Sequence, residues 1–403
     1  MNLSGKTAAL KAALGVMHGS RAFTGPLQAN FNVTNRCNIR CVHCYFHSPH
    51  IEKPNMIELR RARLLHLPLP DRKYLKDLQR LEADPALTLA VIGKLADAGT
   101  RRFQFGGHGE PFSHPHLLEF LQKAKAGGGY CVVNTNGTLL ARNTIDELVR
   151  IGVDNLRITT MAGKAHTYTR THPGCEESVF ETLKGNLLYF AERKKASRHP
   201  GPEVTLVCVI VAQNCGDLFD FAEFAGTVHA DKVIFHLFND AGDPGFAGVV
   251  PTEDQSSCAR QQLEKAGRHL DSLGIGHNVE NALRVFRKKL NTEKLYHVIP
   301  CYLGWLAIRI DLDGGLYPCC ECYAPLGNIY RQDFGDIWNG EAYAVWRKTA
   351  FAINKRKTPV EGCSCGACGH HNLNTRVYKL LHPLRSRSSA FRRLSASEAA
   401  GTE

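Results

Sequence analysis

The stretch Asn32-Val-Thr-Asn-Arg-Cys-Asn-Ile-Arg-Cys-Val-His-Cys-Tyr45 contains three cysteines, Cys37, Cys41 and Cys44, in a C-x3-C-x2-C pattern. Residues 27–33, which overlap its start, are predicted to form a short strand, so the cysteines lie on a loop that leaves a strand end. Three thiolates this close in sequence can converge on one face of an iron–sulfur cube. The fourth iron would then lack a protein ligand, and an open metal position is where a substrate or cofactor binds.

This spacing resembles the signature of the radical S-adenosylmethionine (radical SAM) enzymes, which usually have an aromatic residue beside the third cysteine, here Tyr45. The resemblance implies a 4Fe-4S cluster whose open iron is chelated by the amino and carboxylate groups of SAM. It also implies reductive cleavage of SAM to a 5′-deoxyadenosyl radical, which abstracts hydrogen from an unactivated carbon. The alternative is a structural zinc site built on two of these cysteines with His43 or His47, for which the spacing is unusual.

The composition of the chain excludes some classes of protein. Its 403 residues can form one large domain and a smaller one. We expect a cytoplasmic protein, because no apolar run is long enough to span a membrane and the N-terminus has no signal-peptide core. Fifteen cysteines, ten of them in two clusters, then favour metal ligation over a disulfide framework. The formal net charge of +12 fits nucleic acid, an anionic surface or an acidic substrate, but a solvated face and a basic tail explain it more simply.

Strand and helix patterns alternate between residues 27 and 237. Six strands, nearly all separated by helices, are predicted at residues 27–33, 102–105, 130–134, 155–159, 204–211 and 232–237. Such alternation predicts a parallel sheet with right-handed crossovers. Six repeats predict an α/β fold, a partial (β/α)6 TIM-like barrel rather than the eight repeats of a full one. The family resemblance implies the same barrel.

The domain organisation follows from changes in composition. We expect an N-terminal leader at 1–26, the radical SAM barrel at 27–290, a small C-terminal cluster-binding α+β domain at 291–375, and a basic, flexible tail at 376–403. A basic, leucine-rich insertion at 51–84 is predicted to pack as one or two helices over the barrel mouth. The leader is too short to be an independent peptide-recognition domain.

Polar groups follow several predicted strands, and the site of an α/β barrel lies at the C-terminal ends of its strands. Gly106-Gly-His-Gly-Glu-Pro111 resembles the GGEP motif of the family, whose backbone and glutamate bind the amino group of SAM, although His108 expands it. Asn134-Thr-Asn-Gly137 resembles its TNG motif. Ordinary turns are the alternative for both. The resemblance implies SAM contacts from Gly106, Gly107, Glu110, Asn136, Thr160 and Asn214.

A second set of cysteines lies near the C-terminus, in the pattern Cys301-x12-Gly314-x4-Cys319 followed by Cys365-x2-Cys368. Together with the intervening Gly-Asn-Ile and Ile-Trp-Asn stretches, it resembles the SPASM or twitch extension of radical SAM enzymes. In that extension the first element is a β-hairpin with a ligand on each arm. The resemblance implies one auxiliary 4Fe-4S cluster held by Cys301, Cys319, Cys365 and Cys368.

Three neighbouring cysteines, Cys320, Cys322 and Cys363, have no role in this assignment. The spacing that holds a second auxiliary cluster is absent from the sequence. We expect Cys320 to point away from Cys319, because side chains alternate along a strand. A zinc knuckle that uses nearby histidines is the alternative.

Three functions fit these features. The preferred one is radical SAM oxidation or epimerisation of a small polar molecule such as a sugar or cyclitol, because one auxiliary cluster and no peptide-binding extension are predicted. The second is a peptide maturase that installs crosslinks in a ribosomally made precursor (a RiPP). The third is a non-catalytic zinc- or cluster-binding scaffold that binds RNA. For an enzyme we expect an electron donor such as a flavodoxin or ferredoxin and no membrane partner, and no catalytic side chain is assigned.

Overall fold

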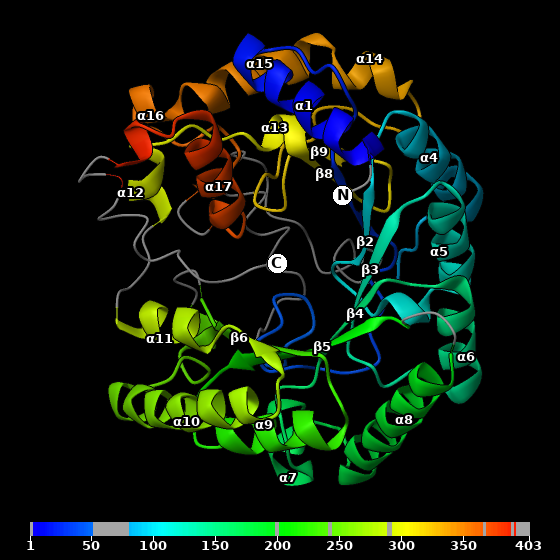
Figure 1. Cartoon of the computed structure of the whole chain (residues 1–403), viewed down its shortest axis with the longest axis vertical. Helices are drawn as coiled ribbons and strands as arrows, with labels where there is room; N and C mark the ends of the chain where they lie inside the picture. Colours follow the sequence, from blue (N-terminus) through cyan, green and yellow to red (C-terminus); the bar gives the residue numbers. More distant parts are fainter. Residues whose placement is uncertain are drawn as a thin grey trace.

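A computed structural model of the chain describes residues 3–50, 80–197, 201–240, 244–287, 292–365, 368–387 and 391. The described strands form one sheet in the order β7-β6-β5-β4-β3-β2-β1-β8-β9. Every neighbouring pair in it is parallel except β8 and β9. The sheet curves into a partial barrel that is not closed, with helices along its outer side (Figure 1).

The six predicted strands are present within one or two residues of their predicted bounds. They are β1 (Gln28–Asn32), β2 (Arg102–Gly106), β3 (Tyr130–Thr135), β4 (Asn155–Thr159), β5 (Glu203–Ile210) and β6 (Lys232–Leu237). Because they are parallel and adjacent, their carboxyl ends meet at one rim. The predicted partial barrel is therefore confirmed.

Three further strands extend the sheet beyond the six predicted ones. β7 (Gly276–His277) pairs with β6 at one edge. At the other edge, β8 (Ala307–Ile310) pairs in parallel with β1 and forms an antiparallel pair with β9 (Leu316–Tyr317). The C-terminal domain thus adds its own strands to the barrel sheet, and this continuity was not predicted from the sequence.

Helices cover the outer face of this sheet (Figure 1). They are α4 (Pro85–Asp97), α5 (Leu117–Ala126), α6 (Arg142–Ile151), α7 (Ala165–Thr171), α8 (Glu177–Ala196), α9 (Leu218–Thr227), α10 (Glu253–Ser272) and α11 (Val279–Arg287). Outward strand residues such as Phe103, Cys131, Leu156 and Leu206 are fully buried in the core. The alternate strand residues point into the barrel.

The C-terminal domain is mostly helical. Its helices are α12 (Thr292–Tyr296), α13 (Leu303–Leu306), α14 (Phe334–Trp338), α15 (Glu341–Phe351), α16 (Ile353–Arg356) and α17 (His371–Leu381). The N-terminal helix α1 (Leu3–His18) packs against α13 and lies beside the C-terminal helices (Figure 1). Buried Arg347 joins the C-terminal domain to the segment after α1. Its Nε donates to the carbonyl of Gly304 at 2.8 Å and its Nη1 to that of Ser20 at 3.3 Å.

Several predictions concern residues outside the described part of the chain. The boundary near residue 290 and most of the insertion at 51–84 lie there. The predicted tail begins at residue 376, whereas α17 continues to Leu381, and most residues after 387 are not described. None of the described helices has the length and apolar character that a membrane span requires.

Candidate functional site

The three cysteines of the N-terminal loop are free thiols that interact electrostatically with one another. Burial raises the pKa of Cys37 to about 11 and also raises the pKa values of Cys41 and Cys44. The backbone N–H groups of Phe46 and His47 donate to Sγ of Cys44 at 3.4 and 3.3 Å. Hydrogen bonds to sulfur are a normal feature around iron–sulfur clusters. The loop therefore fits a cluster with three protein ligands.

The glycine loop after β2 is held against the end of β1. Gly107 has a φ of +117°, and a Cβ there would lie 2.7 Å from Oδ1 of Asn32, so only glycine fits. Nδ1 of His108 lies 2.9 Å from Nδ2 of Asn32. The His108 ring stacks on Phe46 with 3.8 Å between ring centroids. Burial lowers the pKa of His108 well below its usual value. The additional histidine thus connects the glycine loop to β1 and to the cysteine loop.

Glu110 is buried beneath this loop rather than open to the barrel. Its carboxylate accepts hydrogen bonds from Oγ1 of Thr135 at 2.6 Å and from the backbone N–H groups of Asn136 and Phe112 at 2.7 and 3.1 Å. Burial raises the pKa of Glu110 to about 7, although these hydrogen bonds act in the opposite direction. The SAM contact of Glu110 stays a prediction.

The remaining predicted SAM residues are also buried. The side chain of Asn214 accepts from the N–H of Val211 and donates to the carbonyl oxygens of Met161 and Val209, each at 2.9 Å. It thereby holds the turn that follows β5. The hydroxyl of Thr160 is buried without a hydrogen-bond partner among the described residues. The SAM contacts of both residues stay predictions.

A cavity of about 600 Å³ lies inside the barrel. Of the six predicted SAM residues, Gly106 and Gly107 line it, while the other four do not. The cavity runs from the glycine loop and Phe46 to Cys320 and Arg376 of the C-terminal domain. Its volume is that of an ordinary ligand site, and it connects the two cysteine-rich regions of the chain.

The four predicted auxiliary ligands lie near one another. Cys301 interacts electrostatically with Cys368 and Cys365, and Cys319 does so with Cys320, Cys368 and Cys301. The hydroxyl of Tyr296 lies 2.9 Å from Sγ of Cys368. Among the described residues, no three His, Cys, Asp or Glu side chains are close enough to hold a single metal ion. A four-iron cluster spaces its ligands more widely, because each thiolate binds a different iron.

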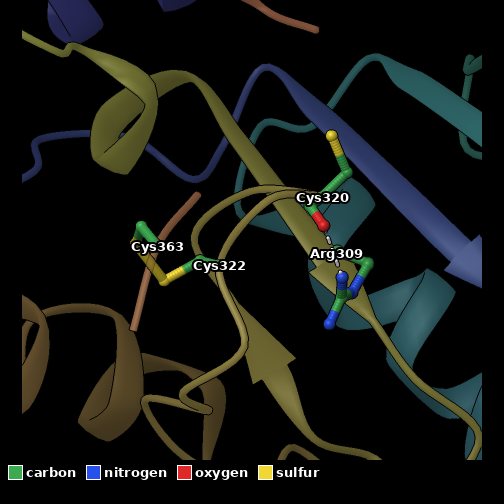
Figure 2. The surroundings of a disulfide bond; sticks show 4 residues. All are labelled: Arg309, Cys320, Cys322 and Cys363. Atoms are coloured by element: carbon green, nitrogen blue, oxygen red, sulfur yellow. Dashed lines mark hydrogen bonds between the residues drawn. A yellow bond between two sulfur atoms is a disulfide. The ribbon is translucent and has the colours of Figure 1, made fainter. Parts of the chain in front are cut away.

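Two of the three remaining cysteines of this domain are paired with each other. Figure 2 shows Cys322 and Cys363 joined by a disulfide across an isolated antiparallel bridge, a pairing that was not predicted. The side chain of Cys320 points away from this disulfide and lines the cavity. Its carbonyl accepts a hydrogen bond of 2.8 Å from Nη1 of Arg309.

Sequence reasoning also missed the polar wall of the cavity. Several inward-facing strand residues line it, among them Asn30, Gln104, Asn134, Arg157 and Arg309. Their alternation with apolar residues along each strand was a usable signal, because in a parallel barrel the second face of a strand points inward.

Comparison with known proteins identifies the family. The radical SAM superfamily model matches residues 31–184, and the model of SPASM, an iron–sulfur cluster-binding domain, matches residues 301–369. A tungsten-containing aldehyde ferredoxin oxidoreductase cofactor-modifying protein from Pyrococcus furiosus is 30% identical over 78% of this chain and 81% of its own length. The chain therefore belongs to the radical SAM superfamily and carries a C-terminal SPASM domain. Its cofactors are accordingly SAM, a 4Fe-4S cluster and an auxiliary cluster.

Other similar proteins span most of the chain. The subtilosin biosynthesis protein AlbA of Bacillus subtilis is 24% identical over 89% of this chain and 71% of its own length. The PqqA peptide cyclase of Gluconobacter oxydans is 22% identical over 85% of this chain and 86% of its own. The crystal structure of Streptococcus suis SuiB bound to precursor peptide SuiA has the same fold, with a TM-score of 0.58 and 13% identity. The match covers 89% of this chain and 76% of the SuiB chain.

Proposed function

We propose that this radical SAM enzyme is a maturase that installs a crosslink in a ribosomally made precursor peptide. The observation that carries the proposal is the similarity to PqqA peptide cyclase over 85% of the chain. The similarity to AlbA, a bacteriocin biosynthesis protein, supports it as well. These comparisons favour the peptide alternative over the small polar substrate preferred from the sequence. That preference rested on the expectation that the chain has no peptide-binding extension, and a precursor peptide can also be delivered by a separate protein.

The chain's own residues would position the reactants. Cys37, Cys41 and Cys44 would hold the SAM-binding cluster, and the backbone at Gly106 and Gly107 would bind the methionine part of SAM. When bound, the reduced cluster supplies the electron that cleaves SAM and so begins radical chemistry. A substrate side chain in the cavity would lie against the glycine loop.

The second set of cysteines would complete the arrangement. Cys301, Cys319, Cys365 and Cys368 would hold the auxiliary cluster, which supplies a one-electron carrier to an oxidative crosslinking reaction. The cavity reaches this domain at Cys320, so a bound side chain would lie between the two cysteine sites. This position suits a reaction that begins at one site and is completed by electron transfer at the other.

The test is a product analysis with the cluster-reconstituted enzyme, SAM and a reductant. The substrates are short peptides encoded beside the gene and, separately, a panel of sugars and cyclitols. We expect one peptide to lose the mass of two hydrogen atoms while 5′-deoxyadenosine accumulates, because a crosslink replaces two bonds to hydrogen. Turnover of a small polar molecule without any change in a peptide would contradict the proposal.

A further inference from the structure

The cavity inside the barrel is strongly basic. Its charged lining consists of four arginines and one glutamate, namely Arg102, Arg157, Arg309, Arg376 and Glu321. An enclosed surface with an excess of one charge attracts ligands of the opposite charge, since low-dielectric walls focus the field. The lining therefore suits an anionic group better than a neutral or cationic one.

Of the four lining arginines, Arg157 is the one without an ion pair or a hydrogen bond to a described residue. It lies on β4 between Leu156 and Ile158, which are fully buried on the helix side, so its side chain points into the barrel. Its register neighbours on the adjacent strands are Asn134 and Thr205, and neither carries a charge. Within the described part of the chain, Arg157 makes no hydrogen bond or ion pair. Only its Nε is sealed from solvent, so the terminal nitrogens are accessible from the cavity.

An unpaired cation in a barrel interior costs free energy unless a ligand compensates it. A guanidinium presents parallel N–H groups that match the two oxygens of a carboxylate. The position of Arg157 is therefore easier to explain as part of a ligand site than as a contribution to folding.

Arg309 lies on the same wall, where an ion pair with Asp311 compensates much of its charge. The residue is 8% exposed. Its Nη1 donates to the carbonyl of Cys320 at 2.8 Å (Figure 2), and its Nη2 donates to Asp311 at 3.1 Å. Its guanidinium carbon lies 4.1 Å from the ring centroid of Tyr317. These contacts prevent the side chain from leaving the cavity wall. Its charge is also felt at His108 in the glycine loop.

We propose that the cavity binds the acidic side chain of an Asp or Glu residue of the substrate, with Arg157 as the direct partner and Arg309, which is paired with Asp311, as a rigid part of the same wall. This inference rests on the proposed function, because it takes the substrate to be a peptide. It names Arg157 as the residue that determines specificity at the modified region. The competing anion in this part of the protein is the carboxylate of SAM itself, and the experiment separates the two.

The test measures binding and needs no turnover. Cluster-reconstituted enzyme saturated with SAM is titrated anaerobically with N-acetyl-glutamate N-methylamide or with the glutamine analogue, which differs only in carrying an amide. We expect ligand-observed NMR to show about ten-fold tighter binding of the glutamate probe, as for loss of a charge-assisted hydrogen bond. The preference should fall to about one in Arg157→Gln and be partly kept in Arg157→Lys. Arg150→Gln, on the exposed face of α6 beside Glu147, is the matched control.

SAM affinity and circular dichroism are measured for the same variants. Lost discrimination with unchanged SAM affinity and an unchanged spectrum supports the inference. Equal binding of the two probes to the unmodified enzyme overturns it. A large loss of SAM affinity in Arg157→Gln also overturns it, since Arg157 would then bind the carboxylate of SAM. Peptide modification is judged separately by product mass, so failure of the proposed function and failure of this site give different results.

Discussion

Oγ1 of Thr135 donates a hydrogen bond of 2.6 Å to Oε1 of Glu110, and this contact joins the last residue of β3 to the loop that follows the neighbouring strand β2. The backbone N–H of Asn136 donates to Oε2 of the same carboxylate at 2.7 Å. The side chain of Asn136 in turn lies 3.9 Å from Sγ of Cys37. One buried carboxylate thus links the glycine loop, the loop after β3 and the cysteine loop.

Replacing Glu110 by Gln is expected to weaken SAM binding by about ten-fold or more. A hydrogen bond from the SAM amino group to a carboxylate contributes about 1.5–3 kcal/mol, and an amide replaces it poorly. Anaerobic titration calorimetry measures the affinity. Glu119→Gln, which alters an exposed carboxylate beside His116, is the control. Unchanged affinity in Glu110→Gln would assign this role to the backbone of the glycine loop.

The same residue predicts a pH dependence. Burial raises the pKa of Glu110 from 4.5 to about 7, so without ligand the folded protein holds a proton that the unfolded chain releases between these values. Stability of the unliganded enzyme should therefore fall, relative to Glu110→Gln, as pH rises through this window. Because an N–H donor of SAM favours the ionised carboxylate, SAM affinity should rise over the same window. The difference in stability between the two proteins gives the contribution of Glu110. Parallel pH profiles of the two proteins would contradict the raised pKa of Glu110.

Replacing Cys37, Cys41 and Cys44 together by Ala should abolish formation of 5′-deoxyadenosine and leave about one cluster per chain, that of the SPASM domain. Chromatographic assay of 5′-deoxyadenosine and analysis of iron and sulfide measure both effects. Cys258→Ala removes an exposed free thiol and should change neither. Continued SAM cleavage by the triple variant would refute the assignment of the first cluster.

Single replacements separate the predicted auxiliary ligands from their neighbour. Cys301→Ser and Cys368→Ser should each reduce the iron content by about one cluster, because each removes a thiolate ligand. Cys320→Ser should keep the full content, since its side chain lines the cavity. Loss of iron in Cys320→Ser with retention in Cys301→Ser would show that the ligand set is different.

Arg347→Met should destabilise the protein by about 3 kcal/mol, because it leaves the carbonyl oxygens of Gly304 and Ser20 without this donor. It also removes the guanidinium from 4.4 Å above the Trp338 ring. The apparent unfolding temperature, measured by scanning calorimetry, should fall by several degrees. Arg356→Met, at an exposed site, should shift it little. Equal shifts of the unfolding temperature in the two variants would mean that Arg347 does not stabilise the contact between the C-terminal domain and the segment at Ser20.

Much of the barrel and the family could be predicted because their signals are local. Each of the six strands is an apolar run bounded by turn residues, so its bounds are encoded within a few positions. The three N-terminal cysteines occupy one short loop, and their convergence requires no distant contact. The helix order between the strands then restricts the sheet to parallel crossovers.

Contacts between distant segments could not be predicted in the same way. Backbone N–H and C=O groups are the same at every residue, so the pairing of β8 with β1 is decided by packing rather than by either strand alone. Cys322 and Cys363 face each other only because two loops meet in the C-terminal domain.

By itself, the sequence determined the family, since the cysteine spacing that marks it lies within one loop, and it determined the alternating order of strands and helices. Only the tertiary structure decided which polar side chains share the cavity, which carboxylate is buried and which arginine lacks a partner. Glu110 and Arg157 illustrate the difference. Their residue types are visible in the sequence, but burial and the absence of a described partner are properties of surroundings that distant strands bring together.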